Sequence, residues 1–296
     1  MEASHAPRNE AADDTGAQEP HDERKSQRGN RRGGRGGRGP GSGGGREEKV
    51  SRALSRLLRH KATSAGIQLD PAGFAPLDKV LAWGPLKSEK VTVDDVKTCT
   101  RDNAKQRFSM KANPSTNPNA ENDDSSDASH WLIRANQGHS ITTLDSSAML
   151  TEISLAAKNV PARVLHGTYY AFWDAIVQKG GLSRMKRNHV HCATGIPGVD
   201  VGVISGMRKD VELLVQIDVE TSLRDGAMQW WLSSNGVVLT EGDENGLIPL
   251  KYFARAEGVK NNVGVLVDNG EKLADLPAGL EIKVPAGKNQ SAGGKK

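Results

Sequence analysis

The amino-acid sequence predicts an α+β fold, because its first half is patterned for helices and its second half for strands. Leucine and valine recur at helical spacing in the stretches that follow residue 49. After residue 163, short β-branched runs alternate with turn residues. Nearly all aliphatic and aromatic side chains lie between residue 49 and residue 283. We therefore expect an N-terminal helical lobe at residues 49–147 and a C-terminal, mostly antiparallel β lobe at residues 148–283.

Three helices are expected in the N-terminal lobe. The first covers residues 49–66, where apolar positions recur at helical spacing and a glycine closes the stretch. A short second helix covers residues 76–83. The third begins after Thr92, which has Asp95 three residues later in a capping-box pattern, and it ends before Arg107.

A two-stranded wing is expected to follow these helices. The polar stretch at residues 112–129 reads as an insertion loop that joins two strands, the second of which resumes at "HWLIRANQ". Three helices followed by such a wing predict a winged-helix module, a type of module that often contacts nucleic acid.

One helix and several strands are expected in the C-terminal lobe. The helix covers residues 169–181 and ends at two glycines. An Asn235–Gly236 pair between two strand-like runs signals a hairpin. The run at residues 211–219 is apolar and β-branched, as in a buried strand. Further strands are expected at residues 164–170, 188–193 and 247–256.

Both ends of the chain are expected to be disordered. Residues 1–48 are mostly acidic up to Glu23, after which every charge from Arg24 to Arg46 is positive and glycine is dense. The basic tail at residues 284–296 also lacks core-forming side chains. Spaced arginines on a flexible chain suit phosphate backbones and unpaired bases. The head is therefore either an RNA-binding accessory or a solubilising tail.

Composition excludes several classes of protein. The two cysteines, Cys99 and Cys192, show no CxxC spacing, so a disulfide framework is not expected and a reducing compartment is. No stretch approaches the roughly 18 apolar residues of a membrane span, and no apolar signal core is present. We expect a soluble monomer in the cytoplasm or nucleus, without a membrane partner.

The stretch "LSRMKRNHVHCA" at residues 182–193 raises a question of chemistry. His189 and His191 are one residue apart, so they share a face of a strand. Together with His166 and Cys192 they form a possible zinc set. Cys192 would point to the opposite face, however, and the neighbouring cations disfavour a dication. We expect no metal, which leaves an anion site or a structural histidine pair.

Cations at three separate positions favour the anion site. Arg59 and His60 close the first helix, Lys105 and Arg107 close the third, and Arg187 precedes the histidines. Each of these taken alone is a plausible solvated surface charge. Together they suggest that cations from both lobes converge on a polyanion, with an ionisable histidine among them.

A family resemblance joins these motifs. The segments "SRALSRLLRHKA", "KQRF", "IRANQGHS", "LHGTYY", "GLSRMKRNHVHCA" and "NGVVLTEG" occur in this order. In that order and spacing they resemble the NAD-dependent RNA 2′-phosphotransferases, over roughly residues 50–256. The sequence departs from the usual family pattern at Cys192 and Ala193, which replace leucine and serine.

The resemblance implies a winged-helix lobe followed by an ADP-ribosyltransferase-like lobe, with NAD as co-substrate. It also implies a two-step reaction. The splice-junction 2′-phosphate of ligated tRNA attacks the nicotinamide riboside carbon of NAD and expels nicotinamide. The 2″-hydroxyl then attacks the phosphorus of the ADP-ribosylated phosphate, which releases ADP-ribose 1″,2″-cyclic phosphate and RNA.

The resemblance also implies residue roles. The catalytic residues would be Arg59, His60, Arg107 and Arg187. The residues that contact NAD would be His166, Gly167, Thr168, Ser183 and His191, with Gly167 allowing close backbone approach. The residues that hold RNA would be Lys105, Arg134, Gln137 and His139. His189 is expected to be structural.

Two other functions stay open at this point. One is an ADP-ribosyltransferase that stops after the first step and modifies a nucleic acid or a protein. The other is a noncatalytic RNA-binding protein, which the glycine- and arginine-rich head and the winged helix would suit.

Overall fold

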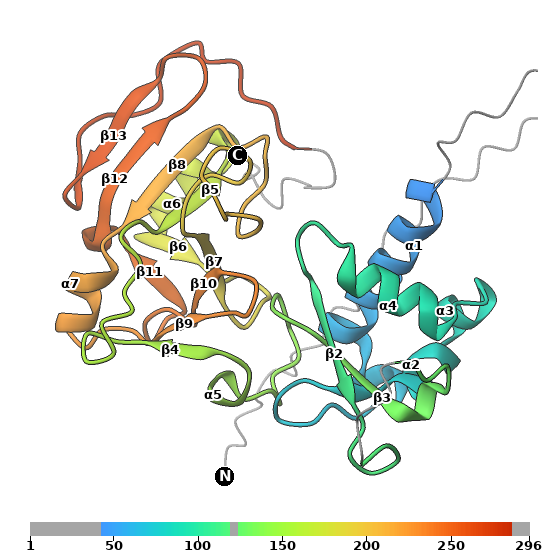
Figure 1. Ribbon diagram of the computed structural model, residues 1–296. Coiled ribbons are helices and arrows are strands. Elements are labelled where there is room, and N and C mark those ends of the chain that lie inside the picture. The colour runs from blue at the N-terminus through green and yellow to red at the C-terminus, as the bar shows by residue number, and fades with distance from the viewer. Residues whose placement is uncertain (1–42, 119–123, 286–296) are drawn as a thin grey trace, which may run out of the picture. The chain divides into compact units, whose positions relative to one another are not determined.

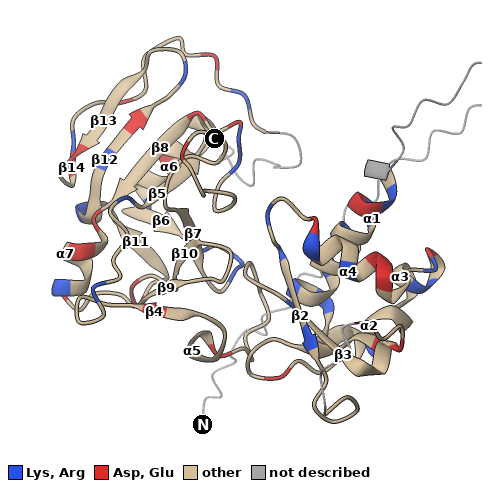
Figure 2. Cartoon of the chain, viewed as in Figure 1, with Lys and Arg blue, Asp and Glu red and all other residues tan. Residues whose placement is uncertain are grey.

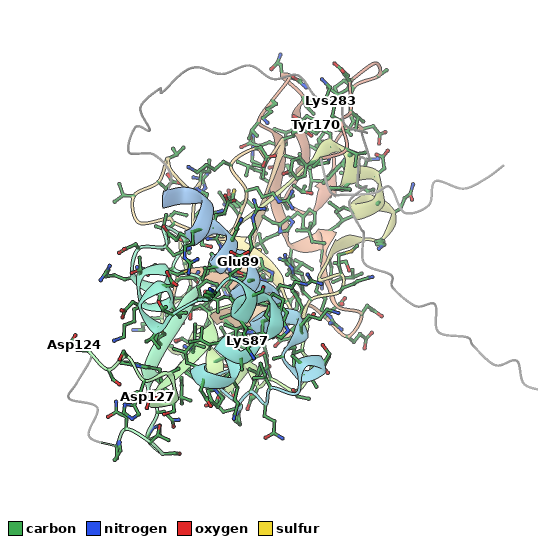
Figure 3. The ribbon with its side chains drawn as sticks, turned by 90° about the vertical axis from the view of Figure 1, so that its right-hand side faces the viewer. Lys87, Glu89, Asp124, Asp127, Tyr170 and Lys283 are labelled. Carbon is green, nitrogen blue, oxygen red and sulfur yellow. The ribbon has the colours of Figure 1, made fainter. Side chains whose placement is uncertain are left out.

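A computed structural model describes residues 43–118 and 124–285 of the 296-residue chain. The glycine- and arginine-rich head up to residue 42, the centre of the polar insertion and the basic tail from residue 286 lie outside the described residues. After the insertion the described chain resumes at Asp124 (Figure 3). The first helix, α1 (Gly43–Arg56), begins before the expected start near residue 49. The end of the stretch expected to be disordered is therefore helical, and the Arg46 guanidinium lies 2.9 Å from an Asp95 carboxylate oxygen.

The helical segments of the N-terminal half lie near their expected positions. They are α1, a π-helical turn η1 (Leu57–Lys61), η2 (Thr63–Ala65), α2 (Leu77–Ala82), α3 (Gly84–Ser88) and α4 (Val93–Arg101). Thr92 forms the predicted capping box with Asp95. Gly66, at a φ of 71°, ends the first helical stretch. The third helix ends at Arg101, so Lys105 and Arg107 lie in the turn that follows it rather than at its end.

Three strands accompany these helices (Figure 1). They are β1 (Ala75–Pro76), β2 (Phe108–Ala112) and β3 (Trp131–Ala135), in the antiparallel order β1-β3-β2. The predicted pair of strands joined by the polar insertion, β2 and β3, is confirmed. The sequence did not predict β1, because two residues are too few to show a strand pattern. The helices and this sheet share one apolar core, to which Leu54, Leu57 and Ile133 contribute fully buried side chains.

A nine-stranded sheet forms the second half (Figure 1). Its order is β14-β13-β12-β8-β5-β7-β10-β9-β4, and every recorded pair of strands is antiparallel. In chain order the strands are β4 (Thr151–Ile153), β5 (Leu165–Thr168), β7 (Val190–Ala193), β8 (Leu213–Ile217), β9 (Trp230–Leu232), β10 (Val237–Thr240), β12 (Phe253–Gly258), β13 (Gly264–Asp268) and β14 (Glu271–Lys272). The α+β prediction with a mostly antiparallel sheet is therefore confirmed.

The remaining elements cover or border this sheet. A small sheet pairs β6 (Gly181–Ser183) with β11 (Leu247–Pro249). The helical segments are α5 (Ser146–Met149), η4 (Tyr170–Phe172), α6 (Trp173–Gln178), α7 (Val219–Arg224) and η5 (Leu250–Tyr252). Tyr170, labelled in Figure 3, is buried in the core of this half and donates a hydrogen bond to the Lys260 carbonyl.

Two sequence expectations for this half need correction. The strand expected over residues 247–256 is two strands in different sheets, β11 and β12, because the chain turns through η5 after Pro249, which has no N–H to donate. The helix expected from residue 169 begins at Trp173. The β9–β10 hairpin is confirmed, with Gly236 at a φ of 75° in its turn. No helix in the described part of the chain is long and apolar enough to cross a membrane.

Candidate functional site

A π-helical turn presents the first two candidate catalytic residues. Leu57 and Leu58 are fully buried and fix this turn to the core, while Arg59 is half-buried and His60 is exposed. Single π turns inside helices are rare and occur often at functional sites, because the extra residue redirects the side chains that follow. The periodicity of "LLRHK" did not reveal this turn.

The loop at residues 136–141 wraps the same turn. The Ser140 amide donates to the Arg59 carbonyl at 3.0 Å, and Ser140 Oγ lies 2.9 Å from His60 Nδ1. Gly138 has a φ of 91°, and a Cβ at this position would lie 3.5 Å from the Arg59 side chain. A glycine is favoured here because an L-residue would be strained at this φ, although its Cβ would make only ordinary van der Waals contact with the guanidinium.

The three candidate catalytic arginines lie close enough to affect one another. Burial and, to a smaller extent, the charges of Arg187 and Arg107 together lower the pKa of Arg59 to about 10. Arg59 is still a cation at neutral pH. Its Nε and Nη2 are buried and without hydrogen-bond partners among the described residues. Arg107 is held by a hydrogen bond of 2.9 Å from its Nη1 to Asn103 Oδ1.

The same cations surround His60. Desolvation lowers the pKa of this imidazole, and the charges of Arg187, Arg59 and Lys61 lower it further. The pKa of Arg187 is lowered by desolvation and by Arg208. In Figure 2 acidic positions of the helical half include those on α1 and α4. Among the described residues, no carboxylate contributes to the shifts of Arg59, His60 or Arg187. The cluster therefore carries uncompensated positive charge, which suits an anion.

Two histidines of the β half join this cluster. His166 Nδ1 lies 2.9 Å from the His191 carbonyl oxygen. His191 Nε2 is buried without a hydrogen-bond partner among the described residues. Burial and the charge of Arg187 lower the pKa of His191 well below its ordinary value, and His189, Arg59 and His166 add to this effect. Desolvation also lowers the pKa of His166. Both rings are therefore neutral at physiological pH.

The structure shows why position 167 is occupied by a glycine. A Cβ there would lie 2.7 Å from Val211 Cγ1 and 3.1 Å from Met207 Sδ. The glycine thus allows residues 207–211 to pack on β5. Thr168 is buried, and its carbonyl accepts a hydrogen bond from the Glu212 amide. Ser183 Oγ accepts one from the Met185 amide, and Ser183 pairs with Leu247 between β6 and β11.

The four candidate RNA-binding residues have different surroundings. Lys105 lies by Arg107, Arg208 and Lys209, whose charges lower its pKa after desolvation. His139 is only 4% exposed and lies near Arg59 and His60. Gln137 lines a small cavity with its neighbour His139. Arg134 packs within the helical half, where its guanidinium lies 4.8 Å from the centre of the Phe74 ring and donates to the Ala72 carbonyl.

Sequence reasoning missed several residues at this site. Arg208 and Lys209 are exposed and lie near Lys105, and the Arg208 guanidinium donates to the Tyr169 hydroxyl at 3.3 Å. The Asn188 amide donates to the His139 carbonyl at 2.9 Å. The adjacent cations in "GMRKD" were a local signal for the first two. Asn188 and Ser140 lie inside the family motifs, but the sequence assigned no role to either residue.

His189 belongs to a hydrogen-bond network centred on the Glu241 carboxylate. Its Nε2 lies 2.9 Å from a Glu241 carboxylate oxygen, which also accepts a hydrogen bond from Ser146. The Trp231 indole donates to the other Glu241 oxygen. Burial opposes ionisation of Glu241, yet these partners bring its pKa down to about 2. The network fits the expectation that His189 is structural.

The possible zinc set named from the sequence includes Cys192. Cys192 lies in the apolar core of the β half, and burial raises the pKa of its thiol to about 12. Across residues 43–118 and 124–285, no group of three or more His, Cys, Asp or Glu residues is placed to hold a metal ion.

Acid is expected to destabilise the fold through His139. Burial and, to a smaller extent, the charges of Arg59 and His189 together lower its pKa to about 3. In the unfolded chain the imidazole titrates near pH 6.5, so the unfolded state binds the extra proton between about pH 6.5 and 3. Stability therefore falls as the pH falls through this window. His139→Gln should flatten the dependence of the melting temperature on pH there.

The matched control for this prediction is His130→Gln, on the polar hairpin. His130 Nδ1 lies 2.8 Å from Ser125 Oγ, and the ring is partly exposed. This variant should keep the wild-type dependence on pH. An equally steep loss of melting temperature in His139→Gln would contradict the assignment.

Comparison with known proteins identifies the family. Residues 45–242 match the model of the RNA 2'-phosphotransferase, Tpt1 / KptA family. The chain is 40% identical over 215 residues to tRNA 2'-phosphotransferase 1 of Danio rerio, covering 73% of this chain and 87% of that protein. Against the Homo sapiens protein of the same name, identity is 38% over 71% of this chain and 76% of that one. Against the tRNA 2'-phosphotransferase of Saccharomyces cerevisiae it is 34%, over 74% and 86%. These matches confirm the resemblance that the six motifs predicted, and the chain is a transferase that belongs to the RNA 2'-phosphotransferase, Tpt1 / KptA family.

Proposed function

We propose that this enzyme removes the splice-junction 2′-phosphate from ligated tRNA with NAD as co-substrate. The products are RNA with a free 2′-hydroxyl, nicotinamide and ADP-ribose 1″,2″-cyclic phosphate. The observation that carries the proposal is that Arg107 and Arg187 both lie near Arg59, and that Arg59 and Arg187 both lie near His60. Among the described residues, no carboxylate contributes to the pKa shifts of Arg59, His60 or Arg187. A phosphate dianion relieves the mutual repulsion of these cations when it binds.

We assign the two halves of the molecule different tasks in this reaction. Residues 49–147 act as a winged-helix RNA-binding lobe, and residues 148–283 act as an ADP-ribosyltransferase-like NAD-binding lobe. Asn188 donates hydrogen bonds to the carbonyls of His139 and Ile141, which join the turn at Arg187 to the loop beside Arg59. These bonds support the proposal that the two halves contribute to one site. The free, buried Cys99 and Cys192 accord with a reducing location in the cytoplasm or nucleus. We propose that the enzyme acts as a monomer.

The arginines hold the reacting phosphoryl group. A guanidinium presents a planar fork that donates two hydrogen bonds to neighbouring phosphate oxygens. Arg59 contributes Nε and Nη2, which have no partner among the described residues. With Arg107 and Arg187 it keeps the phosphate in place for attack and stabilises the negative charge as the pentavalent centre forms.

His60 moves the proton. The surrounding cations lower its pKa, so its imidazole is neutral at rest and can accept the proton of an attacking hydroxyl. A bound dianion offsets those cations and makes the protonated ring easier to form. The same ring can then donate to the departing RNA oxygen.

The residues of the β half fit a dinucleotide beside this phosphate. His191 offers Nε2, a buried nitrogen without a partner among the described residues, and His166 lies against the His191 carbonyl. Thr168 and Ser183 belong to the same proposed surface, at its edge. When bound, NAD supplies the ribose carbon that the phosphate attacks and the hydroxyl that later receives the phosphoryl group. The role of His166, His191 and their neighbours is to bind and orient it.

The RNA strand beyond the reacting phosphate would follow Lys105, Arg208 and Lys209. We expect the double variant Arg208→Ala/Lys209→Ala to raise the KM for 2′-phosphorylated RNA without changing the KM for NAD. The dependence of log affinity on log salt should become shallower by about 1 to 2, because each lost cation releases one fewer counterion. Steady-state kinetics and binding at several salt concentrations test this.

The control for this prediction removes two lysines from α2 and α3. Lys79→Ala/Lys87→Ala changes exposed cations on other elements and should leave both KM values unchanged. A rise in the KM for NAD in the Arg208/Lys209 variant would instead assign these cations to the NAD side.

The proposed function is tested with a short RNA that bears one internal 2′-phosphate. Incubation with NAD should give dephosphorylated RNA and ADP-ribose 1″,2″-cyclic phosphate. RNA that stops at the ADP-ribosylated phosphate would instead indicate an ADP-ribosyltransferase. No consumption of NAD would indicate a noncatalytic RNA-binding protein.

A further inference from the structure

One loop contacts both halves of the cationic cluster. Within residues 136–141, the Ser140 amide donates to the Arg59 carbonyl, and the His139 carbonyl accepts from the Asn188 amide, next to Arg187. A single segment therefore fixes the backbone beside two of the proposed catalytic arginines.

This loop is held by contacts that do not involve the Ser140 side chain. The Asn136 amide donates to the Arg107 carbonyl at 2.9 Å, and Asn136 Nδ2 donates to the Gln106 carbonyl at 2.8 Å. Ser109 Oγ donates to Asn136 Oδ1 at 2.6 Å. Removing the Ser140 hydroxyl should therefore leave the loop in place.

The Ser140 side chain makes a different contact. Its Oγ lies 2.9 Å from His60 Nδ1, which is the one hydrogen bond recorded for this ring among the described residues. Because Nδ1 is engaged, Nε2 is the ring nitrogen left for the substrate. A hydroxyl both donates and accepts, so it can keep this contact whether or not Nδ1 carries a proton.

We propose that Ser140 is a positioning residue for His60. Its hydroxyl fixes the imidazole plane so that Nε2 faces the phosphoryl group throughout proton transfer. The inference rests on the proposed function, because it assigns Ser140 through the role of His60. The charged and titratable groups that face His60 are Arg59, Lys61, Arg187 and the buried His139.

The test is a double-mutant cycle on full-length enzyme with the 2′-phosphorylated RNA and saturating NAD. Ser140→Ala should slow the second step by about tenfold, the order expected for one orienting hydrogen bond. It should also shift the pH profile of that step while the KM for NAD stays unchanged. Ser140→Thr retains the hydroxyl and should restore the rate. In the His60→Ala background, Ser140→Ala should cause no further loss.

Ser109→Ala is the matched control, because it removes a β2 hydroxyl that holds the loop through Asn136 and does not contact His60. It should have equal effects in both backgrounds and should not shift the pH profile. Equal losses from Ser140→Ala with and without His60, or a wild-type rate in Ser140→Ala, would overturn the proposal. Formation of cyclic phosphate by the wild-type enzyme checks the proposed function separately, and melting temperatures verify that each variant is folded.

Discussion

Replacing Arg187 with alanine is expected to abolish removal of the 2′-phosphate while the fold stays intact. Arg187 is exposed, yet its charge lowers the pKa values of Arg59, His60, His166 and His191. Its positive charge thus acts both on residues of the helical half and on the histidines of the β half. Losing a preorganised charge at the reacting phosphate should lower kcat by at least about 10²- to 10³-fold.

Stability should change in the opposite sense from activity. Arg187 raises the electrostatic cost of keeping Arg59 and His60 charged, so its removal relieves repulsion in the enzyme without substrate. The melting temperature of Arg187→Ala should therefore equal or exceed that of the wild type. Single-turnover assays with 2′-phosphorylated RNA and NAD, together with thermal melts, measure the two effects.

Arg224→Ala serves as the control, because Arg224 pairs with Glu220 on the exposed face of α7. It should retain wild-type kinetics. Full activity in Arg187→Ala would remove this residue from the mechanism. A large loss of melting temperature would show that it supports the fold instead.

Elements specified by local chemistry were predictable from the sequence. The Thr92–Asp95 capping box starts α4, and the Asn235–Gly236 turn joins β9 to β10. Both depend on residues within a few positions of each other, where hydrogen bonds and φ preferences decide the outcome.

Features that depend on distant parts of the chain were not predictable. The π turn at Leu57–Lys61 has ordinary helix-forming residues, and its geometry is set by packing against the core and by Ser140, 80 positions later in the chain. The packing of residues 207–211 against Gly167 was likewise not visible in the sequence. Periodicity cannot show which loop covers a given strand, because that pairing is tertiary.

The residues of the cationic cluster were predictable from family resemblance rather than from local chemistry. Arg59, His60, Arg107 and Arg187 were assigned by resemblance, and the structure brings them together. Arg208 and Lys209 belong to no quoted motif, and only the fold reveals their closeness to Lys105. Family motifs therefore named the residues of the cationic cluster, whereas the nearby cations Arg208 and Lys209 had to be located in three dimensions.

His60→Ala is expected to slow the second step more than the first. In the first step the attacking group is a phosphate, which needs no proton removed, so the arginines and the dinucleotide site suffice. In the second step a ribose hydroxyl must lose its proton as the RNA oxygen gains one, and His60 is the titratable side chain proposed to carry that transfer. ADP-ribosylated RNA should therefore accumulate in this variant.

The size of the accumulation depends on how far the second step falls behind the first. Loss of general acid–base catalysis typically costs about 10²- to 10⁴-fold, which would make the second step limiting and the intermediate visible by gel. The neighbouring Lys61→Ala keeps the imidazole and relieves one of the charges that lower its pKa. It should form both products without accumulation. Normal product formation in His60→Ala under single turnover, with no intermediate, would assign proton transfer to another group and leave the arginines as the whole of the catalytic set.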